Sequence, residues 1–113
     1  MRYLSIYRPL TGEEGGMPDA AHMAAMGKLV EEMTRSGALI STEPLRPRSA
    51  GARVRLSGGQ LTVSEETQRA GGFAFIKAGS REEAIELTKQ FLKVAGDGEC
   101  ELREVMEFAP QPA

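Results

Sequence analysis

The sequence is short of the residues that mark several specialised classes of protein. It has one cysteine, Cys100, so no disulfide can form within the chain and no cysteine cluster can hold a metal ion. The 14 Lys and Arg residues do not outnumber the 16 Asp and Glu residues, and the net charge of -2 argues against binding to a nucleic-acid backbone. We therefore expect no metal, no other cofactor and no nucleic-acid partner.

Long apolar runs are also missing. Near the start of the chain only the stretch YLSIY separates Arg2 from Arg8, and Pro9 follows at once. Such a stretch is too short for a signal peptide or a membrane span. We expect a soluble cytoplasmic protein that makes no membrane contact. Its length allows a single modest core, so residues 1–113 are expected to form one domain.

Local patterns predict two helices, four main strands and one small hairpin. The two glycines after Ser57 suit the hairpin turn, because glycine adopts the positive φ angles that such turns require. Ser80 and Glu83 form a capping box at the start of the second helix. In chain order the elements are a strand over 2–8, a helix between Asp19 and Gly37, a strand over 38–45, a hairpin over 52–63, a strand over 71–78, a helix between Ser80 and Gly96, and a strand over 99–108.

Without the hairpin, the order of elements is strand, helix, strand, strand, helix, strand, the split βαβ pattern of the ferredoxin-like fold. We therefore predict an α+β fold of this type with an extra hairpin. Both helices then cover one face of the sheet. We assign the aliphatic residues Leu4, Ile6, Ala74 and Ile76 to the covered face, and Tyr3, Ser5, Tyr7, Phe73, Phe75, Arg103 and Val105 to the opposite face.

The second of these faces is expected to meet a partner, because an apolar, aromatic surface of that size is seldom left to water. Bases, a small ligand and a second copy of the chain are the three alternatives. The stretch GGFAFIKAGSREEAIE (71–86) comes close to the signature with which RNA-recognition domains stack bases. However, Gly71 replaces its basic residue and Ala78 replaces an aromatic one, so an RNA-binding module is our least favoured hypothesis.

Several stretches together resemble the YCII-related (YciI-like) family, specifically its DGPF branch. They include MAAMGKLVEEMTRSGALISTEPLRP, GARVRLSGGQLTV, GGFAFIKAGSREEAIELTKQF and CELREV, of which the block over 51–63 is the most specific. The resemblance implies a dimeric α+β barrel, in which the sheets of two ferredoxin-like subunits pack face to face. It thus implies a homodimer with Tyr3, Tyr7, Phe73 and Phe75 lining the space between the subunits.

The chain departs from this family pattern at one place. After Val63 the family usually carries a Thr-Asp-Gly-Pro-Phe-Ala segment, whereas here Val63 is followed directly by Ser64, Glu65 and Glu66. The acid of that segment is suspected of a role in an active site. Its absence leaves Glu65 and Glu66 as the nearest substitutes.

Three further polar residues are candidates for chemistry, and each has a structural alternative. His22 is expected in the first turn of a helix, where the positive end of the dipole favours the neutral imidazole that a general base requires, but it can equally be a half-exposed structural residue. Glu43 can orient a ligand or lie in solvent. Arg103 can hold a carboxylate with its planar guanidinium, or pair with Glu101, Glu104 or the partner subunit.

Besides the RNA-binding module, two hypotheses follow for the function. The first is a homodimer that binds a small organic ligand in an aromatic-lined pocket, without demonstrated catalysis. Its ligand-binding residues would be Tyr3, Ser5, Tyr7, Glu43, Phe73, Phe75 and Arg103. The alternative is an isomerase- or lyase-like enzyme, in which His22, Glu65 or Glu66 transfers a proton.

Overall fold

A computed structural model describes residues 1–10, 20–46, 50–65 and 70–107 of the chain. These residues form six strands and two helices, close to the predicted ranges. The elements are β1 (Arg2–Pro9), α1 (Ala20–Ser36), β2 (Leu39–Pro44), β3 (Arg53–Ser57), β4 (Gln60–Ser64), β5 (Gly72–Lys77), α2 (Arg81–Ala95) and β6 (Gly98–Glu104).

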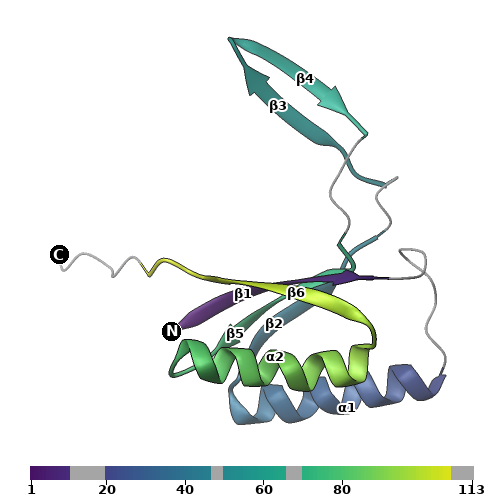
Figure 1. Ribbon diagram of the computed structural model, residues 1–113. Coiled ribbons are helices and arrows are strands. Elements are labelled where there is room, and N and C mark those ends of the chain that lie inside the picture. Colours follow the sequence, from purple (N-terminus) through teal and green to yellow (C-terminus); the bar gives the residue numbers. More distant parts are fainter. Residues whose placement is uncertain (11–19, 47–49, 66–69, 108–113) are drawn as a thin grey trace.

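Four of the strands form one antiparallel sheet in the order β2-β5-β1-β6, and both helices cover the same face of it (Figure 1). This order confirms the predicted α+β fold of ferredoxin-like type. The strands β3 and β4 form a separate hairpin, which we call the arm. The arm stands away from the main sheet on the side opposite the helices (Figure 1). Neither of the described helices is long and apolar enough to cross a membrane.

The predicted stop and start signals of the elements are confirmed where the structure describes them. The N–H of Glu83 donates to Ser80 Oγ at 3.1 Å and the Glu83 carboxylate accepts from the N–H of Gly79 at 3.0 Å, which caps α2. The arm turns at Gly58 and Gly59, whose φ angles of 58° and 79° lie in the left-handed region. Asp19, the predicted cap of α1, lies outside the described residues.

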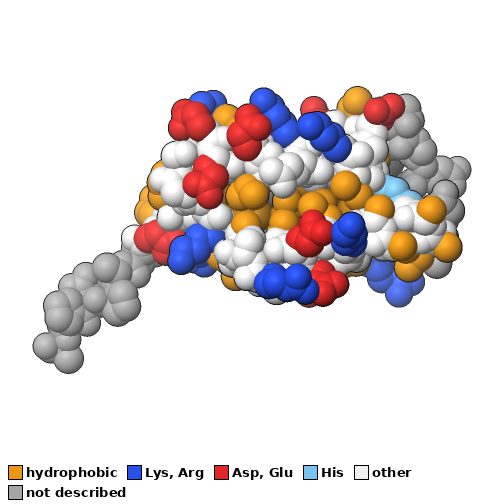
Figure 2. Space-filling view, turned by 90° about the horizontal axis from the view of Figure 1, so that it is seen from below, with side chains coloured by type: hydrophobic (Ala, Val, Ile, Leu, Met, Phe, Trp, Pro, Cys, Tyr) orange, Lys and Arg blue, Asp and Glu red, His pale blue; other side chains and the backbone are white. Residues whose placement is uncertain are grey.

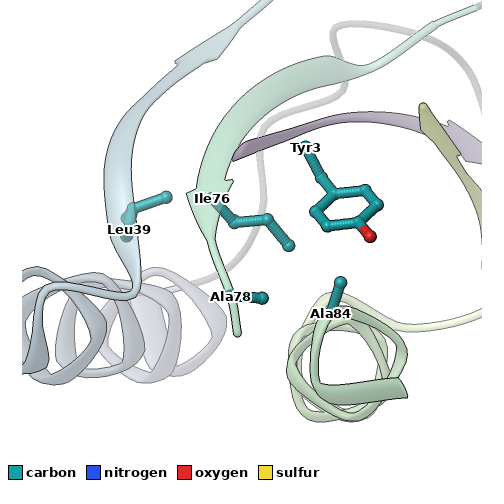
Figure 3. Packing of buried hydrophobic residues seen from close by; sticks show 5 residues of the cluster. All are labelled: Tyr3, Leu39, Ile76, Ala78 and Ala84. Atoms are coloured by element: carbon teal, nitrogen blue, oxygen red, sulfur yellow. The ribbon is translucent and has the colours of Figure 1, made fainter. Parts of the chain in front are cut away.

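The core is a small cluster between the sheet and the helices. The buried hydrophobic side chains of the described residues are Tyr3, Leu39, Ile76, Ala78 and Ala84. In Figure 3 the ring of Tyr3 points from β1 toward Ala84 on α2, with Ile76 beside it. A small residue at position 84 therefore leaves the space that a large aromatic ring fills.

Our assignment of β1 to the two faces of the sheet is wrong. Tyr3 pairs with Ile76 and Ser5 with Ala74 across β1 and β5, and directly opposed residues share a face. Tyr3 and Ser5 are accordingly only 5% and 9% exposed. Tyr7 follows on the same face, where its ring meets that of Phe91 on α2 edge to face, with a centroid separation of 5.4 Å.

A tyrosine suits this helix-facing position because its ring is apolar and its hydroxyl can reach the rim of the core. The Tyr7 hydroxyl donates to the backbone oxygen of Asp97 at 3.5 Å. The aliphatic residues Leu4 and Ile6 are thereby turned to the opposite face. Phe73 and Phe75 lie on that face as predicted, and Ala74 and Ile76 face the helices as predicted.

Two glycine substitutions test the packing of Tyr7 against β6. A Cβ at Gly98 would lie 2.5 Å from Tyr7 Cε1 and 2.9 Å from the backbone oxygen of Arg8, so Gly98→Ala should reduce the free energy of unfolding by about 1–3 kcal/mol. Gly27 is the matched control, because a Cβ there meets no atom within 4 Å in the interior of α1. Gly27→Ala should increase the free energy of unfolding by roughly 0.5–1 kcal/mol. Urea denaturation measures both, and an unchanged stability of Gly98→Ala would contradict the placement of Tyr7.

Candidate functional site

The candidate site lies on the face of the main sheet that the helices leave open. Strand pairing places Leu4 opposite Phe75 and Ile6 opposite Phe73 on this face. On β6, Arg103 lies opposite Leu4 and Glu101 opposite Ile6. We use the name open face for the twelve residues that this alternation collects: Arg2, Leu4, Ile6, Arg8, Ser41, Glu43, Phe73, Phe75, Lys77, Glu99, Glu101 and Arg103.

The centre of the open face is hollowed. The hollow has a volume of about 500 Å³, within the range of pockets that hold small organic molecules. The rings of Phe73 and Phe75 lie edge to face in it, with their centroids 6.1 Å apart. The residues that line it are Leu4, Ile6, Arg8, Leu45, Ala70, Phe73 and Phe75. Arg8 is the one charged side chain among these described lining residues.

Two arginines of the open face share one carboxylate. Arg8 Nη1 lies 3.3 Å from Glu101 Oε1, and Arg103 Nη1 lies 3.7 Å from Glu101 Oε2. The Arg8 side chain is 21% exposed and that of Arg103 is 73% exposed, so the first pair is the better shielded from solvent. Glu101 thus orients Arg8 at the edge of the hollow.

The structure brings two of the seven predicted ligand-binding residues into the hollow. Phe73 and Phe75 line it. Glu43 lies on the open face opposite Phe73, and Arg103 lies there opposite Leu4, but neither lines the hollow. The ion pair of Arg103 with Glu101 is one of the partners that its structural alternative named.

Tyr3, Ser5 and Tyr7 do not belong to this site, because they point toward the helices. Placing them on the ligand-binding face was wrong, because the residues directly opposite Tyr3 and Ser5 on β5 are Ile76 and Ala74, which face the helices. The residues of β1 that line the pocket are instead Leu4, Ile6 and Arg8, which alternate with the tyrosines.

The structure describes two of the three residues proposed as alternatives for proton transfer, and they lie in different parts of the fold. His22 is a half-buried residue of α1, which lies on the side of the sheet opposite the hollow (Figure 1). Figure 2 views the molecule from this helix side. Glu65 follows directly after the last residue of the arm and is exposed. Glu66 lies outside the described residues. Neither His22 nor Glu65 lines the hollow.

The sequence analysis missed five of the lining residues. Three of them lie on a strand with a periodic pattern, and two lie outside any such pattern. Leu4, Ile6 and Arg8 alternate in step along β1, so the correct register with Phe73 and Phe75 would have found them. Leu45 and Ala70 lie where the chain leaves β2 and enters β5, in segments without a periodic pattern. No local signal in the sequence indicates that these two residues wall a pocket.

Burial changes the pKa of titratable groups on the helix-facing side of the sheet. Burial raises the pKa of the Cys100 thiol, although a hydrogen bond with Ser5 acts in the opposite direction. Burial also raises the pKa of Tyr7. Among the described residues no group of three or more His, Cys, Asp or Glu side chains is arranged to hold a metal ion.

Comparison with protein families identifies a match for this chain. The family model of the YCII-related domain matches residues 1–109, which is nearly the whole chain. Comparison with curated proteins found no match. The match is to the YCII-related domain, so the assignment to the DGPF branch stays a prediction.

The raised pKa of Cys100 predicts slow reaction of this thiol. The thiolate is the reactive form, so alkylation by iodoacetamide at pH 8 should be at least about tenfold slower in the folded chain than in the same chain in urea. Because the folded state holds the proton more tightly, this contribution to stability is present below the ordinary pKa of 9.0 and is lost as the pH rises through the raised value.

Mass spectrometry of the alkylated chain measures the rate, and Cys100→Ala serves as the unlabelled control. Equal rates in the folded and unfolded chain would show that the thiol is accessible and unperturbed.

Proposed function

Because this chain belongs to the YCII-related family, we propose that it is a homodimer that binds a small organic ligand between the open faces of its two subunits. Each subunit contributes its hollow to the space between the sheets. The family resemblance drawn from the sequence implies the same pairing. Catalysis is not part of the proposal.

The observation that carries this proposal is the apolar hollow on the open face. Its lining combines six apolar residues with Arg8, on a sheet face that no other described element covers. Burial of apolar surface contributes about 25 cal/mol per Å², so a second copy that covers this face stabilises the assembly. Partial coverage around a central hollow leaves room for a ligand.

The chemistry of the lining defines the class of ligand. Phe73 and Phe75 present ring edges and faces that suit a flat, apolar molecule. Arg8 supplies N–H donors at one side, which suit a carboxylate or another oxygen-bearing group. A small aromatic or alicyclic molecule with one polar end meets both requirements.

The acid-base alternative lacks comparable support, because His22 lies on the helix side and Glu65 at the arm. An RNA ligand would also require excess positive charge near Phe73 and Phe75. The open face carries four arginines and lysines against three carboxylates, so its excess of positive charge is small, and the whole chain carries a net charge of -2. A small ligand therefore fits the site better than either alternative.

The solution mass tests the dimer. Light scattering should give twice the chain mass of 12.2 kDa for the wild type. Phe75→Lys places a charge in the middle of the buried face, and we expect it to give the mass of a single chain at micromolar concentration. Lys93→Glu, an exposed position of α2, is the control and should remain dimeric. Circular dichroism shows whether each variant is folded, and a wild type of single-chain mass would contradict the proposal.

The fluorescent probe anilinonaphthalene sulfonate tests the pocket, since it joins flat apolar rings to an anion. The wild type should enhance its fluorescence in a saturable way. Phe73→Ala should weaken the binding of the probe at least about tenfold, because an aromatic wall of the hollow is lost. Ser41→Ala alters the same face outside the hollow and should change the affinity less than about twofold. An equal loss in both variants would contradict binding in the hollow.

A further inference from the structure

The arm has one aliphatic and one polar face. Val54 lies opposite Val63, and Leu56 lies opposite Leu61 in the register of β3 and β4. Since directly opposed residues share a face, these four side chains form one strip, which we call the aliphatic strip. The other face carries Arg53, Arg55, Ser57, Gln60, Thr62 and Ser64.

The aliphatic strip is unusually exposed in the single chain. Val54 and Leu56 are each 67% exposed, and Leu61 and Val63 are each 72% exposed. Strict alternation of aliphatic and polar residues is the pattern of a strand pair that buries one face. An isolated two-stranded hairpin is also marginally stable in water. Both facts indicate that the strip packs on another surface.

The arm is attached at the border of the hollow. It is inserted between β2 and β5, and Leu45 and Ala70, which flank the insertion, both line the hollow. The N–H of Leu45 donates to the backbone oxygen of Gly71 at 3.0 Å, so the two ends of the insertion are held together. From there the arm rises on the side of the open face (Figure 1).

We propose that the aliphatic strip packs against a second copy of the chain, so that each subunit of the dimer holds the other with its arm. This inference rests on the proposed function, in which the second copy covers the open face. A strand of five residues spans about 17 Å, whereas two packed sheets lie about 10 Å apart. An arm beside the partner therefore reaches past the partner's sheet, toward its helix layer.

The size of the open face supports this occupant. A standard stable interface uses about 20–30 residues on each side, more than the twelve residues of the open face. The arm brings four large aliphatic side chains to the same side of the molecule. Arg53 and Arg55 on the other face of β3 stay in water and oppose the addition of further strands.

A pair of double variants tests the proposal on the full chain. Leu56→Ser with Leu61→Ser changes one opposed pair of the aliphatic strip. Arg55→Ser with Thr62→Ser changes the adjacent opposed pair on the polar face and is the matched control. Sedimentation equilibrium over a range of concentrations gives the dimer dissociation constant. We expect the strip variant to raise this constant at least about tenfold, and the control to change it less than about twofold.

Each other outcome has a distinct meaning. An unchanged dissociation constant in the strip variant would overturn the role of the arm and leave the dimer through the open face intact. A lower thermal stability of the dilute single chain, without a change in dissociation, would show that the strip packs on its own subunit and would also overturn the proposal. A wild type that stays monomeric at every concentration would overturn both the arm and the proposed dimer.

Hydrogen exchange of the wild type tests the proposal independently, because it requires no substitution that could disturb folding. Amides of the arm should be protected at concentrations above the dissociation constant and exchange faster below it, in proportion to the fraction of monomer. Exchange of the arm at one rate across all concentrations would contradict its packing on a second copy.

Discussion

The pairing of β1 with β5 is the constraint on which the rest of the structure depends. Once Tyr3 lies opposite Ile76, every second residue of β1 faces the helices, and the residues between them face the hollow. A shift by one residue would bury Leu4 and Ile6 and expose two tyrosines. The contact of Tyr3 with Ala84 and that of Tyr7 with Phe91 oppose such a shift, because α2 offers space for a ring at one position and a ring partner at the other.

The fold was predictable because its signals are local. Ser80 and Glu83 mark the start of α2, and Gly58 and Gly59 mark the turn of the arm, each through hydrogen bonds or φ angles within a few residues. The order of the elements then indicates the ferredoxin-like arrangement. The faces of β1 were not predictable in this way, since tyrosine and leucine both suit a half-buried strand. Only the register with another strand, set by tertiary packing, separates them.

The site was partly predictable for the same reason. Phe73 and Phe75 were assigned to the correct face, because Ala74 and Ile76, which alternate with them along β5, suit the helix face. Leu45 and Ala70 reach the hollow through the path of the chain around the arm, which no periodicity encodes. His22 shows the limit of such reasoning, since a residue type suited to proton transfer lies on α1, on the side of the sheet away from the pocket. The chemistry of a residue makes it a candidate for a functional site, but the topology of the fold determines which candidates lie close together.

The insertion point of the arm separates the residues that stabilise the folded subunit from the residues that we propose to contact a second copy. The main sheet closes beneath the arm through the contact of Leu45 with Gly71, and the core cluster contains no residue of the arm. Substitutions in β3 and β4 can therefore accumulate without loss of the folded subunit. If the gene is duplicated, divergence of the arm alone would then let each of the two proteins form homodimers in preference to mixed dimers. Both proteins would keep the same fold and the same pocket.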